Sequence, residues 1–417
     1  SSTTANITAK ALTVSGITAS SKTYDGSTSA TLDSTSVTYT GLLSGDTFTG
    51  SYSGVFANAN VGTGKTVNIT SSYSGTDSGN YSVTDQSSTT ADISTKTLTA
   101  TASASNKTYD GGTTASTTLT FTGLVGSETL GQTVGSTFDN KNVGSNKTVT
   151  VNSIALADGT NGGLAANYSI SAGQTTTAHI APKSLTVSGN TASNKIYDSN
   201  SSATVTVTLS GFVGSETLTY TNSSSFNNKN VGTGKTVTVD SITLADGNNG
   251  GLASNYSVTP GQTTTANITA KSLTVSGITA SSKTYDGSTS ATLDTSSVLY
   301  SGLISGDTFN GSYTGAFSNA NVGTGKTVTI TSSYSGADVS NYSVTNQSST
   351  TADISTKALT ATTSVSNKTY DATNSATATL TLAGLVGSET LGSTNTSTFN
   401  NKNVGSNKTV TVNSITL

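Results

Sequence analysis

The stretch KALTVSGITASSKTYDG, residues 10–26, contains the two patterns that decide the fold. Its first part, Ala11–Ser15, alternates apolar and polar side chains, which is typical of a half-buried β-strand. Similar runs lie at Ser36–Thr40, Lys65–Thr70 and Tyr81–Thr84, between clusters of Gly, Asn, Asp and Ser. No window of a dozen residues has apolar positions at i, i+3, i+4 and i+7, so helices are not expected. The chain is predicted to be all-β.

The same stretch recurs along the chain. Its opening Lys-x-Leu-Thr appears five times, at steps of 86, 87, 88 and 86 residues, beginning at Lys10, Lys96, Lys183, Lys271 and Lys357. The closing Tyr-Asp pair begins at Tyr24, Tyr109, Tyr197, Tyr285 and Tyr370. An Asn-Val-Gly turn follows in each copy, at Asn60, Asn142, Asn230, Asn321 and Asn403. Self-similarity at a fixed period identifies tandem repeats.

These landmarks divide the chain into five repeats. Residues 1–9 match the closing strand of a preceding repeat, and the repeats span 10–95, 96–182, 183–270, 271–356 and, incompletely, 357–417. Repeats 1 and 4 contain Ser-Gly-Asp-Thr-Phe and are called type A; repeats 2, 3 and 5 contain Gly-Ser-Glu-Thr-Leu and are called type B. Residues 1–156 align with 262–417 at a constant offset of 261, which indicates a duplicated three-repeat unit.

Each repeat is predicted to be a two-sheet, Ig-like β-sandwich. About seven short strands in 86 residues fit that architecture. The alternative is a parallel β-solenoid, which needs a coil period of about 20 to 30 residues that the repeats do not show. Neighbouring repeats meet without a flexible linker, so we expect an elongated rod on the order of 180 Å long, from a strand rise of about 3.3 Å per residue.

Composition excludes several classes of function. Only 9% of residues are charged, the formal net charge is −3, and the basic residues are single lysines without any arginine. No patch can neutralise phosphates or bind an anionic membrane surface, so nucleic acid and lipid are not expected partners. No apolar run reaches the roughly 18 residues that span a bilayer. The absence of cysteine removes disulfides, zinc–thiolate sites and thiol nucleophiles.

Three segments, Lys22–Gly26, Lys107–Gly111 and Lys283–Gly287, resemble the signature of the YDG domain. The resemblance covers the whole chain through its five repeats. It implies tandem repeats of a very large secreted bacterial protein, similar to filamentous haemagglutinin exported by two-partner secretion, and hence an extracellular or cell-surface location. Ser199 and Ala372 stand where the signature has Gly, which argues against a need for positive φ at that position.

Few residues carry candidate chemistry. The Tyr-Asp pair is interpreted as structural, with Tyr near the core and Asp forming a turn. His179 is the only histidine, which excludes a catalytic dyad based on histidine, and it is expected on an exposed strand. Lys10, Asp46 and Asn80 are candidates for an intramolecular Lys–Asn isopeptide bond assisted by a carboxyl group, although solvated lysines are the simpler interpretation.

No cofactor is expected. Calcium is the one alternative, at the loops that contain Asp158 with Asn161 and Asp246 with Asn248, but this spacing is more typical of tight turns. The sequons at Asn106 and Asn167 would accept glycans in an organism that glycosylates its adhesins.

We therefore expect a structural stalk or filament shaft of a bacterial adhesin, and not an enzyme. The alternative is that the repeats are themselves weak multivalent modules that bind glycans or matrix. Expected partners are neighbouring repeats, host or matrix glycans, and sibling chains. Ser1–Ala9 match Gln262–Ala270 while repeat 5 ends without such a strand. The simpler interpretation is an arbitrary window on a longer array, and the alternative is a filament in which one chain's first strand completes another chain's last repeat.

Overall fold

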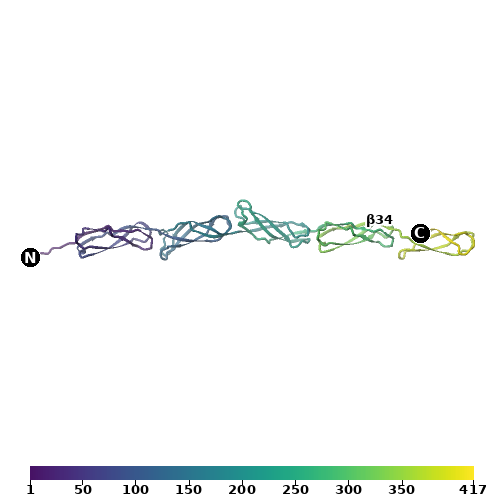
Figure 1. Cartoon of the computed structure of the whole chain (residues 1–417), viewed down its shortest axis with the longest axis horizontal. Coiled ribbons are helices and arrows are strands. Elements are labelled where there is room, and N and C mark those ends of the chain that lie inside the picture. The colour runs from purple at the N-terminus through teal and green to yellow at the C-terminus, as the bar shows by residue number, and fades with distance from the viewer. The chain divides into compact units, whose positions relative to one another are not determined.

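The computed structural model describes all 417 residues and is all-β, which confirms the predicted class. It divides into two compact units, one made of residues 1–186, 209–220 and 243–259, and the other of 187–208, 221–242 and 260–417. Figure 1 shows one group of strands for each repeat, in the order of the colour bar, with β34 labelled in the fourth. No helix of the structure is long and apolar enough to cross a bilayer.

Repeat 1 is a two-sheet sandwich. Its elements are β1 (Lys10–Ser15), β2 (Thr18–Ala19), β3 (Lys22–Thr23), β4 (Ser29–Ala30), β5 (Leu32–Asp33), β6 (Thr38–Thr40), β7 (Thr49–Phe56), β8 (Gly62–Ser74), the 3₁₀ turn η1 (Ser78–Asn80), β9 (Tyr81–Thr84) and β10 (Ser88–Ser94). One sheet has the order β6-β1-β9 and the other β3-β10-β8-β7-β4, while β2 pairs with β5. The solenoid alternative is therefore wrong.

The first stretch of each of the first four repeats contributes to both sheets. Strands β1 and β9 pair in parallel, with Lys10 opposite Tyr81. Strands β3 and β10 also pair in parallel, with Lys22 opposite Ile93. The other pairs in these sheets, such as β7 with β8, are antiparallel. Residues 10–23 thus connect the two layers.

Repeat 2 repeats this plan with its own strand lengths. Its elements are β11 (Lys96–Thr97), β12 (Thr99–Ala104), β13 (Lys107–Thr108), β14 (Thr114–Ala115), β15 (Thr117–Thr122), β16 (Leu130–Phe138), β17 (Gly144–Asp158), η2 (Ala165–Asn167), β18 (Tyr168–Ser169) and β19 (Thr175–Ala181). Repeat 3 has β20 (Lys183–Ala192), β21 (Lys195–Ile196), β22 (Val205–Ser210), β23 (Thr219–Phe226), β24 (Gly232–Ala245), η3 (Ala253–Asn255), β25 (Tyr256–Val258) and β26 (Thr263–Thr269), and its residues are divided between the two units.

The second unit contains repeats 4 and 5. Repeat 4 has β27 (Lys271–Ser276), β28 (Thr279–Ala280), β29 (Lys283–Thr284), β30 (Ser290–Ala291), β31 (Leu293–Asp294), β32 (Leu299–Ser301), β33 (Asn310–Phe317), β34 (Gly323–Ser335), η4 (Val339–Asn341), β35 (Tyr342–Thr345) and β36 (Ser349–Ser355). Repeat 5 has β37 (Thr360–Val365), β38 (Ser375–Ala376), β39 (Ala378–Ala383), β40 (Thr394–Phe399) and β41 (Val410–Thr416).

Each core is small and lies between the sheets. In repeat 1 the alternation of β1 puts Leu12 and Val14 inside, where they pack with Ile17, Phe48 and Tyr81. Leu32, Leu42, Val61 and Ile69 are only partly buried. Ile17 is 1% exposed although it lies outside any strand, because its backbone N–H donates to the side chain of Gln86.

Candidate functional site at the repeat junctions

The tyrosine of each of the first four Tyr-Asp pairs points out of its own repeat into the next one. The Tyr24 hydroxyl donates to Glu128 Oε1 of repeat 2 at 2.6 Å, and the Tyr168 hydroxyl of repeat 2 donates to Glu128 Oε2 at 2.5 Å. The two tyrosine rings meet edge to face at 5.4 Å. Burial, followed by the hydrogen bond to Glu128, raises the pKa of Tyr24 to about 12. We call this contact a repeat junction.

The junction between repeats 2 and 3 has the same plan with an added cation. The hydroxyls of Tyr109 and Tyr256 each donate to a different oxygen of Glu216, both at 2.7 Å. Lys141 pairs with the same carboxylate at 2.9 Å. Glu216 is 7% exposed, and burial alone would raise its pKa, but hydrogen bonds from Tyr256, Tyr109 and Lys141 lower it instead.

At the junction between repeats 3 and 4, two carboxylates accept the tyrosine hydroxyls in place of one glutamate. Asp307 accepts from the Tyr342 hydroxyl at 2.5 Å and from Ser199 Oγ at 2.9 Å. Asp338 accepts from the Tyr197 hydroxyl at 3.3 Å and pairs with Lys229 at 3.1 Å. The hydrogen bond to Asp338 is the largest contribution that raises the pKa of Lys229. Each repeat type thus satisfies the preceding tyrosine with its own acidic residues.

A buried asparagine adds a second contact at three junctions. Asn255 is 0% exposed, its Oδ1 accepts the backbone N–H of Val143 at 2.9 Å, and its Nδ2 donates to Asn142 at 3.1 Å. Asn167 and Asn341 make the equivalent pair of bonds to the preceding repeat. The asparagine of the Asn-Tyr pair in one repeat therefore hydrogen-bonds to the Asn-Val-Gly turn of the preceding repeat. Because Asn167 is buried by this contact, it cannot accept a glycan.

Apolar packing continues across the junctions. One cluster joins Tyr24, Phe56 and Ile93 of repeat 1 to Leu98 and Tyr168 of repeat 2. A second cluster joins residues of repeat 2, including Phe138 and Ile180, to Leu185 and Tyr256 of repeat 3. Because buried apolar area is the main source of stability, neighbouring repeats stabilise one another.

The lysine before Tyr-Asp is held by its own repeat. The Lys22 ammonium donates to Asp25 Oδ1 at 2.8 Å and to the carbonyl oxygens of Ser27 and Ser29, and it lies 5.5 Å from the ring centre of Phe56. Asp25 also accepts the backbone N–H of Ser27, which confirms the predicted turn. All five repeats have this lysine over a phenylalanine ring.

The residue after Tyr-Asp has a left-handed backbone in every repeat, contrary to the expectation from Ser199 and Ala372. Their φ values are 65° and 64°, close to the 75° of Gly26. Ser and Ala therefore accept the strain that Gly avoids. The expectation failed because the turn geometry is imposed by the Lys–Asp contacts and not by the residue type.

The three isopeptide candidates, Lys10, Asp46 and Asn80, lie in one region of repeat 1, but their side chains do not contact one another through hydrogen bonds or ion pairs. Asp46 Oδ2 accepts from the Tyr81 hydroxyl at 2.5 Å, and Asn80 directly precedes Tyr81. Lys10 lies opposite Tyr81 in the β1–β9 pair, but its exposed side chain makes no hydrogen bond or ion pair with either residue. These contacts favour the simpler interpretation, in which Lys10 is a solvated lysine.

The remaining candidates occupy turns and a strand. Asp158 Oδ1 accepts the N–H of Ala165, and Asn161 donates to the carbonyl oxygen of Ser127. Asp246 accepts from Ala253, while the backbone N–H of Asn248 donates to Thr217. No group of three or more His, Cys, Asp or Glu residues is placed to hold a metal ion. His179 is exposed on β19, as predicted, and its Nδ1 accepts the N–H of Asn146.

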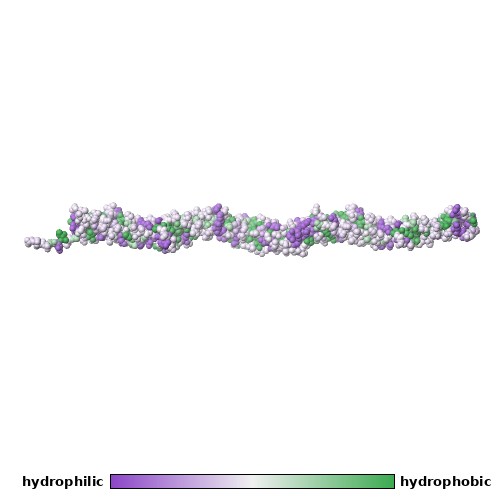
Figure 2. Space-filling model, turned by 90° about the horizontal axis from the view of Figure 1, so that it is seen from below, coloured by the Kyte–Doolittle hydropathy of each residue, from purple (hydrophilic) through white to green (hydrophobic).

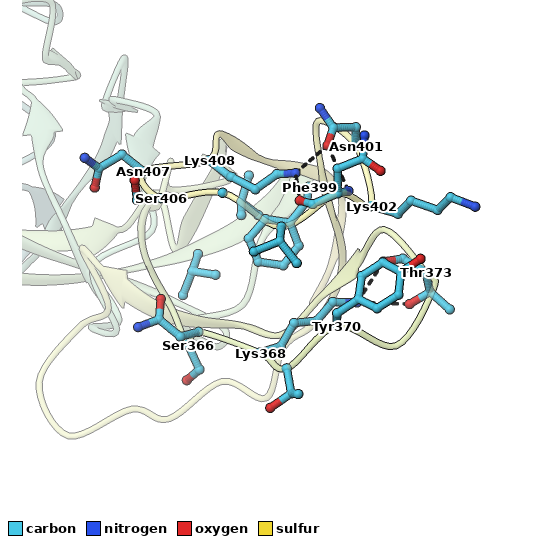
Figure 3. Close-up of a pocket in the computed structure, with 17 residues that line it drawn as sticks. Ser366, Lys368, Tyr370, Thr373, Phe399, Asn401, Lys402, Ser406, Asn407 and Lys408 are labelled. Carbon is cyan, nitrogen blue, oxygen red and sulfur yellow. Dashed lines mark hydrogen bonds between the residues drawn. The ribbon is translucent and has the colours of Figure 1, made fainter.

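Repeat 5 contains an open groove of about 890 Å³ lined by Lys368, Phe399, Asn401 and Lys408, among others (Figure 3). In repeat 4 the equivalent position, between β29 and β34, is filled by β36. We call the last strand of a complete repeat, such as β36, its closing strand.

The junction partners of Tyr-Asp were not predicted from the sequence. The Gly-Ser-Glu-Thr-Leu segment that contains Glu128 served there only as a marker of repeat type, and Asn167 only as a candidate for glycosylation. The available signal was that every copy combines Tyr-Asp, Asn-Val-Gly, one acidic residue and, when complete, Asn-Tyr. Residues that recur once in every repeat are suited to contacts between repeats, because each junction then has the same set of partners.

These observations define a tandem array of all-β, Ig-like repeats joined by side-chain junctions. The family model of the YDG domain matches residues 8–91, 94–178, 181–266, 269–352 and 355–417, so the chain belongs to the YDG-domain family. No curated protein matches it. Among solved structures it is similar to the N-terminal eight Ig domains of Down Syndrome Cell Adhesion Molecule (DSCAM) isoform 1.30.30, at 8% identity and a TM-score of 0.14, over 93% of this chain and 60% of that chain. So low a TM-score carries no argument.

Proposed function

We propose that the five repeats serve as the structural stalk or shaft of a secreted or cell-surface bacterial adhesin, similar to exoproteins of the filamentous haemagglutinin type. One observation carries the proposal. The Tyr-Asp signature, which combines an aromatic ring with a carboxylate, is used within the array: Tyr24 binds Glu128 of the next repeat and Asp25 binds Lys22 of its own. The residues that recur in every repeat therefore support connection between repeats and not recognition of a separate ligand.

The surface supports the same proposal. Figure 2 shows that residues of intermediate hydropathy, drawn pale, cover most of the visible face, while hydrophobic and strongly hydrophilic residues form small separate groups. Such a surface offers few strong contacts to a partner, because binding energy is usually concentrated in aromatic and arginine residues. The proposed location outside the cell is supported by the composition, rich in Ser, Thr, Asn and Gly and without cysteine or arginine, which resembles that of large secreted bacterial repeat proteins.

Small-angle scattering of chain 1–417 tests the stalk. We expect a maximum dimension on the order of 180 Å, the length estimated from strand rise. The matched variant Asn167→Ala, Asn255→Ala, Asn341→Ala should scatter as a more flexible particle, because each substitution removes one junction contact. A compact particle for the unmodified chain would contradict the proposal.

A glycan array separates the stalk from the alternative of a multivalent binding module. We expect no signal above background for chain 1–417. Concentration-dependent capture by one class of glycan would favour the binding module, because several weak sites on one chain give a strong combined signal.

A further inference from the structure

The residue after Tyr-Asp lies against the next repeat, and it differs with the type of that repeat. Gly26, Gly111 and Gly287 precede type B repeats, whereas Ser199 precedes the type A repeat 4. We propose that this residue is a specificity-determining position that selects which type of repeat forms a close junction behind it.

Type B repeats leave little room for a side chain at this position. A Cβ built on Gly26 would lie 2.8 Å from Val125 Cγ1, and one built on Gly111 would lie 2.7 Å from Val213 Cγ1. At Gly287 the distance to Val386 Cγ1 would be 3.0 Å. The same valine belongs to the Val-Gly-Ser-Glu segment that defines type B, and the type A repeat 4 has Ile304 at its position.

Type A repeats require a side chain with a hydroxyl group. In type B, one glutamate bridges the tyrosines of both repeats, as Glu216 does between Tyr109 and Tyr256. In repeat 4 the shorter Asp307 bonds to its own Tyr342, and its other oxygen is satisfied by Ser199 Oγ at 2.9 Å. Asp307 has a side chain only 1% exposed, so this oxygen would otherwise lack a strong donor from the preceding motif.

Lysine at the Asn-Val-Gly turn does not follow this division, because repeat 2 precedes a type B repeat and has Lys141, which pairs with Glu216 at 2.9 Å. Lys229 lies 3.1 Å from Asp338 and 3.7 Å from Asp307, so it balances two carboxylates of the type A repeat. The division therefore rests on the residue after Tyr-Asp: serine suits the aspartate of repeat 4, and glycine suits valine with glutamate.

Hydrogen exchange of chain 1–417 tests the proposal with Gly111→Ser. The reporter is the amide of Val143, which donates to Asn255 across the junction, and the internal control is Val149, which pairs with Phe138 inside repeat 2. We expect exchange at Val143 to accelerate about tenfold or more, because overpacking opens the junction, while Val149 stays unchanged.

Two further variants separate steric exclusion from backbone strain. Gly111→Ser with Val213→Ala should restore slow exchange at Val143, because it removes the obstacle while the left-handed serine remains. Ser199→Gly should accelerate exchange at Val231, whose amide donates to Asn341, and Ser199→Gly with Ile304→Val and Asp307→Glu should slow it again. Unchanged exchange at Val143 in Gly111→Ser, or no recovery in either combined variant, would overturn the proposal.

Discussion

At the scale of single residues, the junctions of repeats 1 and 2 and of repeats 2 and 3 each depend on one carboxylate, Glu128 or Glu216, that accepts two tyrosine hydroxyls. Hydrogen bonds to a charged group contribute about 1.5–3 kcal/mol, and leaving such a group partly unsatisfied is costly. The two residues of the Tyr-Asp pair therefore have different partners: the tyrosine binds the following repeat, and the aspartate binds a lysine of its own repeat.

Asn255→Ala should destabilise the junction between repeats 2 and 3 by about 1–3 kcal/mol, because the buried amide of Val143 loses its acceptor. Thermal unfolding followed by calorimetry measures the effect. The matched control is Asn80→Ala, the equivalent residue of repeat 1, which is exposed and contacts no preceding repeat. Equal losses for the two variants would contradict the role of Asn255.

Stability should also depend on pH at both extremes. Burial, then the bond to Glu216, raises the pKa of Tyr256 to about 12, above the ordinary value of about 10. This contribution is complete below about pH 10 and is lost as the pH rises towards 12. The pKa of Glu216 is lowered, so its contribution is present above about pH 4.3 and is lost as the pH falls further.

Unfolding midpoints of chain 1–417 measured from about pH 3 to 12, with tyrosinate absorbance recorded in parallel, check both limits. Tyr256→Phe should reduce the alkaline loss. A variant with the same alkaline profile as the unmodified chain would count against Tyr256 as its source.

At the scale of elements, the irregular starts of β17 and β24, where their register with the closing strand shifts, use a side-chain acceptor from that strand. His179 Nδ1 accepts the N–H of Asn146, as Asn267 Oδ1 accepts that of Gly234 in repeat 3. His179→Ala should cost about 0.5–1.5 kcal/mol, the net value of one hydrogen bond, whereas His179→Asn should be nearly neutral. Thermal unfolding compares them, and equal midpoints for the two variants would disprove the role of the acceptor.

The closing strand should be replaceable in trans. A synthetic peptide with the sequence of residues 349–355 should bind the groove of repeat 5, because β36 fills the equivalent position in repeat 4. Binding measured by calorimetry should disappear for a peptide carrying Ile354→Asp, since Ile354 is 1% exposed in β36. Identical behaviour of the two peptides would contradict strand replacement.

Strand positions were largely predictable from alternation, and Tyr81–Thr84 matches β9. Strand number was not: about seven were expected, and repeat 1 has ten, because its opening and middle strands are interrupted by short turns. The buried Ile17 was missed because alternation does not extend to a residue that is fixed by the side chain of Gln86. Periodicity detects residues within strands and not those held between them.

At the scale of the whole molecule, repeats and their types could be read from the sequence, but the junctions could not. Tyr24 and Glu128 are 104 residues apart, and nothing in the local sequence of either indicates the other. Only the fold places the end of one repeat beside the start of the next.

The intact mass of chain 1–417 should equal the sum of its residues, with no loss of ammonia. Lys10 is exposed and makes no bond with Asn80, so its amine is not positioned to attack the side-chain amide. Mass spectrometry of the denatured chain decides the question. A deficit of one ammonia that disappears in Lys10→Gln would establish an isopeptide bond at this lysine.

The parallel pairing of β3 with β10 has a consequence for how the chain is made. Because Lys22 pairs with Ile93, the layer β3-β10-β8-β7-β4 of repeat 1 is not complete until its last strand, β10, has been synthesised. Synthesis runs from the N-terminus, and domains generally fold as units in that order. Each repeat is therefore finished before its successor, and its tyrosine end is already in place when the next acidic residue emerges from the ribosome.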